Sequence, residues 1–308
     1  MSKYLRIAAA IALGAVSLAA QPVLHLTIVS HNEETSWRQN DYLNNQRFYL
    51  QNRELVRQLA VVIKARNGAW NFQSDWNFLL AVERHDTPAV TASTNNKNLL
   101  RWLVEDMGFE VNPHAHESTY NYADVAYLHE RVAKVATPSV VGGFLYYPAE
   151  NNQGWEQHQN GESGVKFPGY FWQPQILWGA ATANHRGPDE DSYGIWRPQD
   201  KANFTTHSPA QRLIYIASGC KSDFEENGPA GVDAFLNARN LNPNGFYTAN
   251  YMINQGRLSA ETITRVAAEL DRLSANPRVV WSPLSRTVSK WLAGGGQPIR
   301  ASCASMSL

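Results

Sequence analysis

A short apolar run leads directly into a histidine-rich motif in the stretch Phe109-Glu110-Val111-Asn112-Pro113-His114-Ala115-His116-Glu117-Ser118. Before it, residues 97–107 carry leucine and valine at helical spacing, and Gly108 follows as a helix stop. The sequence therefore predicts a helix, a turn and a strand over 109–112. Two histidines at i and i+2 on a continuing strand point to the same face, where both imidazoles can reach one divalent ion.

The alternation of strand and helix continues along the chain. Strands are expected at 23–30, 69–73, 109–112, 139–145, 175–179, 213–217, 246–251 and 278–281, and helices at 50–66, 97–107, 123–135, 260–273 and 285–292. Such alternation is typical of an α/β protein with a parallel sheet, either closed into a barrel or open and doubly wound. The first strand runs into His31-Asn32-Glu33-Glu34 instead of a glycine-rich phosphate loop, which argues against a dinucleotide-binding fold. In a barrel, catalytic groups lie where strands end, and both histidine-rich motifs occupy such positions.

Residues 1–20 have the pattern of a secretory signal peptide. Lys3 and Arg6 precede an uncharged apolar segment at 7–16, and small residues follow. This segment is shorter than the roughly 20 residues of a membrane-spanning helix. We therefore expect residues 21–308 to form one exported domain, periplasmic or secreted, without an integral membrane segment; a retained anchor is the alternative.

Charge and cysteine content limit the classes of partner. The chain has 27 basic and 27 acidic side chains, and loss of Lys3 and Arg6 with the signal would leave a net charge of about −2. No basic run is present, so nucleic-acid binding is not expected. Cys220 and Cys303 fit neither a zinc ribbon nor a redox pair. In an oxidising compartment they form one disulfide or remain two free thiols, and both alternatives stay open.

On these motifs the chain resembles the superfamily of polysaccharide deacetylases and related glycoside hydrolases. The resemblance implies a single (β/α)-barrel of about seven strands, and residues 149–200 then read as long loops over its C-terminal face. In the deacetylases the first strand ends in a pair of aspartates, and the third ends in two histidines four residues apart. Here Asn32 stands in place of the aspartate that serves as the base, and an amide cannot accept a proton at neutral pH. Ser118 stands where the second histidine would fall.

The resemblance also implies a metal site. Glu33, His114 and His116 are the expected ligands of a divalent ion, and zinc suits their nitrogen and oxygen donors. An alternative alignment pairs His31 with Glu33, as in the first-strand motif of some metal-dependent glycosidases, and makes His31 a fourth ligand. A catalytic ion needs an open position for water, so one of the four would then act as base or support.

The remaining candidates follow other predicted strand ends. Catalytic roles fall to His31, Asp75 and Glu117 near the first three strands, and to His207 as a general acid from a later one. Asp75 serves equally well as the cap of a helix that begins at Trp76. Candidate saccharide contacts, with burial in the core or helix initiation as the alternatives, are Trp76, Tyr120, Asn121 and Trp172.

The expected function is therefore that of an exported, metal-dependent carbohydrate hydrolase that removes an acyl group from a saccharide with metal-activated water. A glycosidase or other sugar-processing enzyme on the same barrel is one alternative. A saccharide-binding protein without catalysis is another, and Asn32 and Ser118 favour it.

Overall fold

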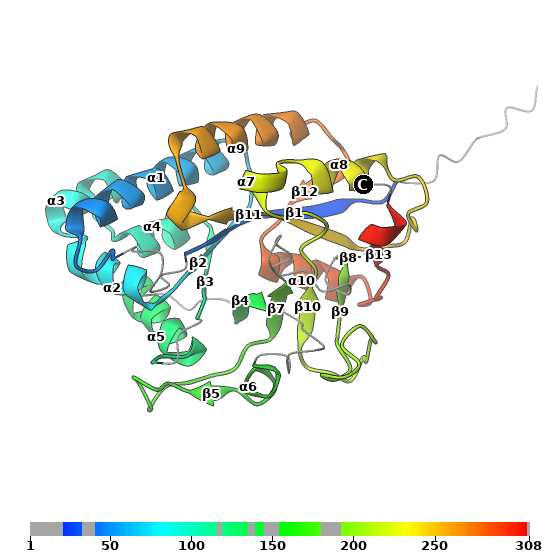
Figure 1. Ribbon diagram of the computed structural model, residues 1–308, viewed down its shortest axis with the longest axis horizontal. Helices are drawn as coiled ribbons and strands as arrows, with labels where there is room; N and C mark the ends of the chain where they lie inside the picture. Colours follow the sequence, from blue (N-terminus) through cyan, green and yellow to red (C-terminus); the bar gives the residue numbers. More distant parts are fainter. Residues whose placement is uncertain are drawn as a thin grey trace, which may run out of the picture.

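The protein has two main sheets with helices packed on their outer faces (Figure 1). The structure is a computed structural model, and it describes residues 21–32, 41–115, 119–134, 139–144, 154–179 and 192–306. The mixed α/β class that the sequence predicts is confirmed. In the described residues, no helix is both long and apolar enough to cross a lipid bilayer.

β1 is the central strand of the first sheet. One of its edges pairs in parallel with β11 along its whole length, and the other pairs with β12 at its start and with β2 at its end. β3 then pairs in parallel with β2. The strands are β1 (Leu24–His31), β2 (Trp70–Ser74), β3 (Glu110–Pro113), β11 (Tyr247–Asn254) and β12 (Val279–Trp281). All five are predicted from the sequence, because strands covered on both faces read as nearly continuous apolar runs.

The second sheet lies below the first in Figure 1. It contains the parallel strands β4 (Val140–Phe144), β7 (Ile176–Gly179) and β10 (Ile214–Ile216), with β9 (Ile195–Trp196) antiparallel to β10. β4 lies next to β3 of the first sheet. On the other side, the segment after β10 is bonded to β11, since the amides of Asn250 and Met252 donate to the carbonyls of Ser218 and Ser222, both at 2.8 Å.

Helices cover the outer face of the first sheet and bury the largest core against it. They are α1 (Gln46–Ala65), α2 (Trp76–His85), α3 (Pro88–Thr91), η1 (Ala92–Thr94), α4 (Leu99–Glu105), α5 (Tyr122–Ala133), α7 (Phe224–Asn227), α8 (Ala230–Asn237), η2 (Gln255–Arg257) and α9 (Ala260–Leu273). Figure 1 shows α1 and α9 side by side along the upper edge. The sequence predicts α1, α4, α5 and α9; the strand-to-helix pattern did not reveal the shorter helices α3, α7 and α8.

The segment expected to form long loops has more regular structure than the sequence predicts. Its described part contains α6 (Trp155–Asn160) and the short strands β5 (Glu162–Ser163), β6 (Phe171–Trp172) and β8 (Ser192–Tyr193) in addition to β7 and β9. β5 pairs with β6, and β8 pairs with β13 (Ala301–Ser302) near η3 (Cys303–Ser305). Several of its aromatic side chains form a second core on the outer face of the second sheet.

α10 (Leu284–Ala293) fills the space between the two sheets at one end. Its Leu284, Val288 and Trp291 cluster with the first residues of β4, β7 and β10. These first residues mark the amino-terminal ends of the strands. The apolar plug therefore leaves the carboxyl-terminal ends as the place where polar side chains can gather.

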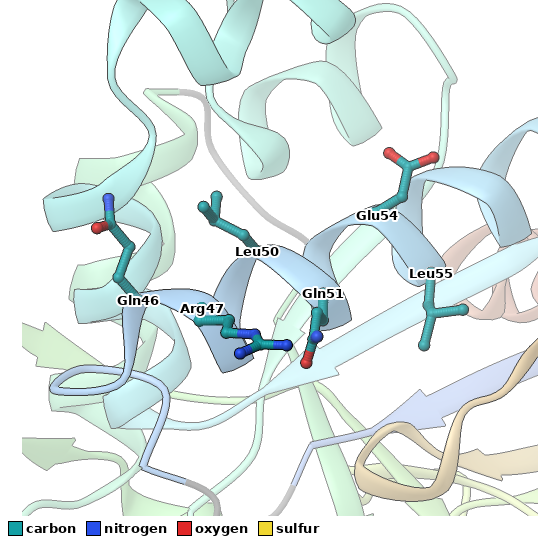
Figure 2. A pocket seen from close by; sticks show the side chains of 6 residues that line it. All are labelled: Gln46, Arg47, Leu50, Gln51, Glu54 and Leu55. Atoms are coloured by element: carbon teal, nitrogen blue, oxygen red, sulfur yellow. The ribbon is translucent and has the colours of Figure 1, made fainter.

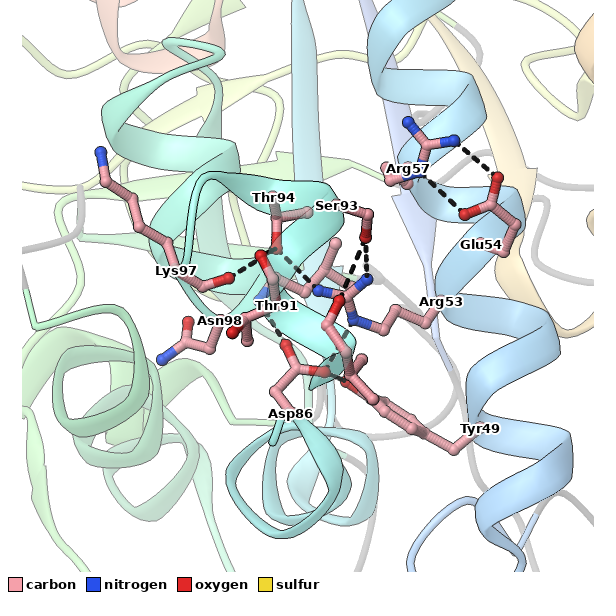
Figure 3. A network of polar contacts seen from close by, with 12 residues as sticks. Tyr49, Arg53, Glu54, Arg57, Asp86, Thr91, Ser93, Thr94, Lys97 and Asn98 are labelled. Carbon is pink, nitrogen blue, oxygen red and sulfur yellow. Dashed lines mark hydrogen bonds and ion pairs between the residues drawn. The ribbon is translucent and has the colours of Figure 1, made fainter. Parts of the chain in front are cut away.

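A buried ion pair joins α1 to the chain between α2 and α4 (Figure 3). Arg53 Nε donates to Asp86 at 2.7 Å, and the Tyr49 hydroxyl donates to the same carboxylate at 2.6 Å. The other carboxylate oxygen accepts from the amide of Leu99 at 2.6 Å. Burial and, to a smaller extent, the negative charge of Asp86 raise the pKa of Tyr49 well above its usual value. The phenol therefore keeps its proton and remains a donor. Three donors from two helices, α1 and α4, depend on this one carboxylate.

Replacing Asp86 by Asn should lower the free energy of unfolding by about 3 kcal/mol, because it leaves the Arg53 charge buried without its counter-ion. Arg57→Ala is the matched control, since Arg57 pairs with Glu54 on the exposed side of the same helix, where such pairs contribute about 0.5 kcal/mol. Urea unfolding of the two variants measures both effects. Equal losses would show that the buried pair has no special weight.

Cys220 and Cys303 form a disulfide with their Cα atoms 5.8 Å apart. It ties η3 to the segment between β10 and α7, and both cysteines are buried. Of the two alternatives that the sequence leaves open, the structure has the disulfide.

Reduction should destabilise the protein by about 4 kcal/mol, because the bond closes a long loop and restricts the unfolded chain. The pair is separated by 83 positions in the sequence. The midpoint of urea unfolding should fall when a reductant is added, and the Cys220→Ser/Cys303→Ser variant should start low and no longer respond to reductant. An unchanged midpoint under full reduction would contradict this expectation.

Candidate active site

The carboxyl-terminal ends of β1, β2 and β3 lie side by side and carry the candidate residues. The amide of Asn32 donates to the carbonyl of Gln73 at 2.9 Å, and the amide of His114 donates to the carbonyl of Ser74 at 3.1 Å. These bonds continue the strand pairing by one residue on each side of β2. They hold His31, Asp75 and His114 at three neighbouring strand ends, as expected from the parallel arrangement.

His31 and His114 form a buried imidazole pair. Their ring centroids are 4.2 Å apart with planes inclined at 35°, and the two residues are 4% and 1% exposed. Trp178 of β7 lies edge-on to His31 at 5.1 Å. The sequence places these histidines in separate motifs, and the structure brings them into contact.

A hydrogen bond from His114 to the carbonyl of Gly142 fixes which ring nitrogen is protonated. Nδ1 of His114 lies 2.6 Å from this oxygen, which also accepts from the Tyr122 hydroxyl at 3.0 Å. A carbonyl oxygen can only accept, so Nδ1 carries a proton, and in the neutral imidazole Nε2 then carries the lone pair. Metal-binding histidines are typically held by this kind of bond. The donor chemistry of His114 therefore fits a divalent first-row ion, and His31 offers a second imidazole beside it.

Two glycines of β4 allow this close packing. A Cβ atom on Gly143 would lie 2.6 Å from Cε1 of His31 and 3.2 Å from Cε1 of His114. Gly143 also has φ +80°, a conformation that side chains disfavour. A Cβ on the preceding Gly142 would lie 2.7 Å from Oε1 of Gln73. Both imidazole edges thus face a stretch of backbone without side chains.

Asp75 lies next to this pair and also caps a helix. Its Oδ1 accepts from the amide of Phe78 in α2 and from the side-chain amide of Asn32, both at 3.4 Å. The residue is 3% exposed. The sequence leaves open whether Asp75 is a catalytic residue or a helix cap. Its position is compatible with both, because the residue that caps α2 also directly follows the end of β2.

Of the four candidate saccharide contacts, Trp76 directly follows Asp75 and contacts Tyr120, whereas Asn121 and Trp172 stabilise the fold. Trp76 is half-buried and stacks on Tyr120, with ring centroids 5.4 Å apart and planes at 17°. Asn121 caps α5, and its side-chain amide donates to the carbonyl of Ser163 at 2.8 Å. Trp172 is buried in the core of the second sheet. Tyr120 is itself buried in the core of the first sheet, so the partly exposed Trp76 is the better candidate for a sugar contact.

His207 lies at the other end of the strands. Its Nδ1 accepts from the amide of Arg197, which follows β9, and its ring contacts Trp291 of α10. β9 runs antiparallel to β10, so Arg197 and α10 both lie where β10 begins. The structure therefore does not bring His207 to the imidazole pair. Sequence order alone did not show at which end of a strand this loop lies.

Glu33 and His116, which are the other proposed ligands, lie outside the described residues. The catalytic candidate Glu117 and the signal segment 1–20 also lie outside them. Within the described part of the chain, no group of three or more metal-ligating side chains is assembled. Of the ligands that the resemblance implies, the described residues include His114 and, in the alternative alignment, His31.

Glu225 is an acidic residue at the same end of the strands that the sequence analysis did not identify. Its Oε2 lies 3.4 Å from the amide nitrogen of Asn254, at the end of β11. Burial and, to a smaller extent, the negative charge of the nearby Asp223 raise the pKa of Glu225 to about 7. The only signal in the sequence is the acidic run Asp223-Phe224-Glu225-Glu226, which has no metal or catalytic spacing.

Two hollows lined by described residues do not include the imidazole pair. One is a groove of about 680 Å³ along the start of α1, lined by the six residues labelled in Figure 2, Gln46, Arg47, Leu50, Gln51, Glu54 and Leu55. The other, of about 690 Å³, lies between the end of α8 and the C-terminal segment. The candidate site is therefore identified from its side chains and not from either of these hollows.

Comparison with known proteins finds similarity only among solved structures. No family model matches the chain, and no curated protein matches its sequence. A 4-alpha-glucanotransferase from Thermococcus litoralis has a TM-score of 0.49 and 11% identity over 88% of this chain, which spans 41% of that protein. A protein described as a probable polysaccharide deacetylase from Pseudomonas aeruginosa has a TM-score of 0.49 and 9% identity, covering 88% of this chain and 91% of its own. An allantoinase has a TM-score of 0.46 and 9% identity, covering 88% and 90%.

Gly143→Ala should displace His31 and disrupt the imidazole pair while leaving most of the fold intact, because the added methyl group would overlap that ring. Gly169→Ala is the matched control, since nothing lies within 4 Å of the added Cβ there. The histidine ring signals in NMR spectra should shift strongly only in the first variant. Unchanged signals in Gly143→Ala would show that the close approach of β4 is not needed.

Proposed function

We propose that this protein is a metal-dependent hydrolase that removes acyl groups from saccharides. The observation that carries the proposal is the buried His31–His114 pair at the strand ends, with Nδ1 of His114 bonded to the carbonyl of Gly142. This bond leaves Nε2 of His114 as a metal-binding atom. His114, together with Glu33 and His116, would hold the divalent ion, for which zinc is the best match.

The roles of the other residues follow from their positions. A bound divalent ion supplies Lewis acidity, which lowers the pKa of water and polarises a carbonyl group. Asp75 is the proposed base that takes the proton of the attacking water, in place of the aspartate that Asn32 replaces. The side-chain amide of Asn32 donates to Asp75 and holds it beside the pair. His31 is either a further ligand or a support for the base.

Trp76, stacked on the buried Tyr120, is the proposed platform for the sugar ring. It follows Asp75 directly and is partly exposed. Aromatic faces bind the apolar faces of sugars, and packing against Tyr120 holds the Trp76 ring in place. The substrate class is therefore proposed to be an acylated oligosaccharide or polysaccharide.

We also propose that the two sheets together make the seven-stranded barrel that the resemblance implies, with β4 beside β3 and the segment after β10 bonded to β11. Export to the periplasm or the medium is proposed from the signal-like segment 1–20. A buried disulfide is compatible with an oxidising compartment.

Glycoside hydrolysis is a second candidate for the same site. Two carboxylates, Asp75 and Glu225, lie at the same end of the first sheet on opposite sides of β1, and glycosidases use a pair of carboxylates. Release of acetate supports deacylation, whereas release of a shorter sugar supports glycoside cleavage. Binding of an oligosaccharide without any product would favour a non-catalytic protein.

The central test is elemental analysis of the untreated protein combined with an assay of acetate release from acetylated xylo-oligosaccharides. We expect a stoichiometric divalent transition metal, loss of activity with a chelator and recovery on adding zinc. His114→Ala should lose the metal and reduce acetate release by about 100-fold or more.

His25→Gln is the matched control for this test. His25 lies on the same face of β1 as His31 but six residues earlier, where it stacks on Phe246. It should keep both metal and activity. A metal-free wild-type protein with a His114→Ala variant that behaves identically would overturn the proposed site.

A further inference from the structure

We infer that Glu225 is the proton donor to the leaving oxygen or nitrogen in the proposed deacylation. The inference rests on the proposed function. It assigns the acid role to a residue outside both histidine-rich motifs.

The strand register places Glu225 at the candidate site. Asn254, whose amide lies 3.4 Å from Oε2 of Glu225, is the last residue of β11 and pairs with His31 of β1. Neighbouring strands lie about 5 Å apart. The bridge between Asp223 and Met252 holds the start of α7 against the same strand. The amides of Asn250, Met252 and Asn254 all point away from β1, so the carboxyl group lies beyond β11 at the same end of the sheet, about two strand spacings from His31.

One oxygen of this carboxyl group is unbonded. Oε1 of Glu225 is buried and has no hydrogen-bond partner among the described residues, although the residue as a whole is partly exposed. A buried polar atom without a partner is costly in a folded protein. Such an atom at the carboxyl end of a parallel strand is available to a substrate group.

The surroundings of Glu225 favour its protonated form. Burial raises its pKa most, Asp223 on the same segment raises it further, and Arg257 from η2 lowers it by less. Arg265 from α9 directs its guanidinium to the backbone carbonyls of Phe224 and Glu225. The charge of Arg257 also faces Glu226, at 3.8 Å. On the β1 side, the titratable residue in register with Asn254 is His31.

Asp75 and Glu225 lie on opposite sides of the end of β1. Asp75 is reached through Asn32 on the β2 side, and Glu225 through Asn254 on the β11 side. Asp75 accepts a helix N-terminal amide, and helix N-termini favour negative charge. Two carboxyl groups in such different surroundings are suited to opposite roles, one as base and one as acid.

Deacylation in this site passes one proton to Asp75 and takes one from Glu225. The oxygen of water bonds to the acyl carbon while its proton passes to Asp75. The bond between the acyl carbon and the sugar oxygen or nitrogen then breaks, and the proton of Glu225 passes to that leaving atom. The products are the carboxylic acid and the free sugar hydroxyl or amine, and exchange with solvent restores both carboxyl groups.

The experiment compares two esters across pH 5 to 9 in the wild-type protein and in Glu225→Gln. An acetylated xylo-oligosaccharide needs its leaving oxygen protonated, whereas 4-nitrophenyl acetate releases a stable anion without help. Wild-type kcat/KM for the sugar ester should fall as pH rises through about 7, where Glu225 loses its proton. Glu225→Gln should lose about 100-fold or more on the sugar ester together with this basic limb, and stay within about threefold on 4-nitrophenyl acetate.

Glu226→Gln is the matched control, because Glu226 is the next residue on the same short helix and is exposed. It should keep the wild-type rates and pH profile. Equal losses on both esters in Glu225→Gln would indicate a structural role and overturn the assignment, as would an unchanged rate and basic limb on the sugar ester. A wild-type protein that releases acetate from neither ester would overturn the proposed function, and the role of Glu225 with it.

Discussion

The close approach of β4 to the ends of β1 and β3 is the constraint on which the site depends. Gly142 and Gly143 bring bare backbone against Gln73 and both imidazoles, where any side chain would overlap them. The same backbone supplies the carbonyl that fixes the proton of His114 on Nδ1. Steric fit and tautomer are thus set by two adjacent residues. The second sheet shapes the site that the first sheet carries.

The space between the sheets changes character from one end to the other. At the amino ends it is apolar and filled by α10, whereas nearer the carboxyl ends a row of amides begins. Asn71 donates to Glu110 at 3.3 Å and to Asn112, and Gln73 donates to Asn71 at 2.8 Å. Burial raises the pKa of Glu110, which Ser285 of α10 supports with its hydroxyl and amide. Ser285 of α10 provides hydrogen bonds at the amino-terminal end of this polar row, and the row extends towards the imidazole pair. Polar side chains therefore gather at the carboxyl-terminal end of the space between the sheets.

Local patterns in the sequence predict the strands of the first sheet and the two histidines at their ends, because apolar runs and turn residues are short-range signals. His31 and His114 could be named individually, but their contact depends on strand register and on Gly143, which lie far apart in the sequence. His207 shows the opposite limit, since its chemistry suited a site from which the topology separates it. Trp172 likewise has the composition of a sugar platform, yet it is buried in the second core. Long-range pairing decides these cases.

Glu225 shows why a catalytic carboxyl can escape motif analysis altogether. Its value as an acid depends on three features that come from different segments: the bridge of Asp223 to β11, the pairing of Asn254 with His31, and the burial of Oε1. None of them leaves a spacing in the sequence. Asp75 differs because its helix-cap position can be predicted from neighbouring residues. A division of labour between these two carboxyls would follow from their environments, because the helix N-terminus favours the charged form of Asp75, whereas burial favours the protonated form of Glu225.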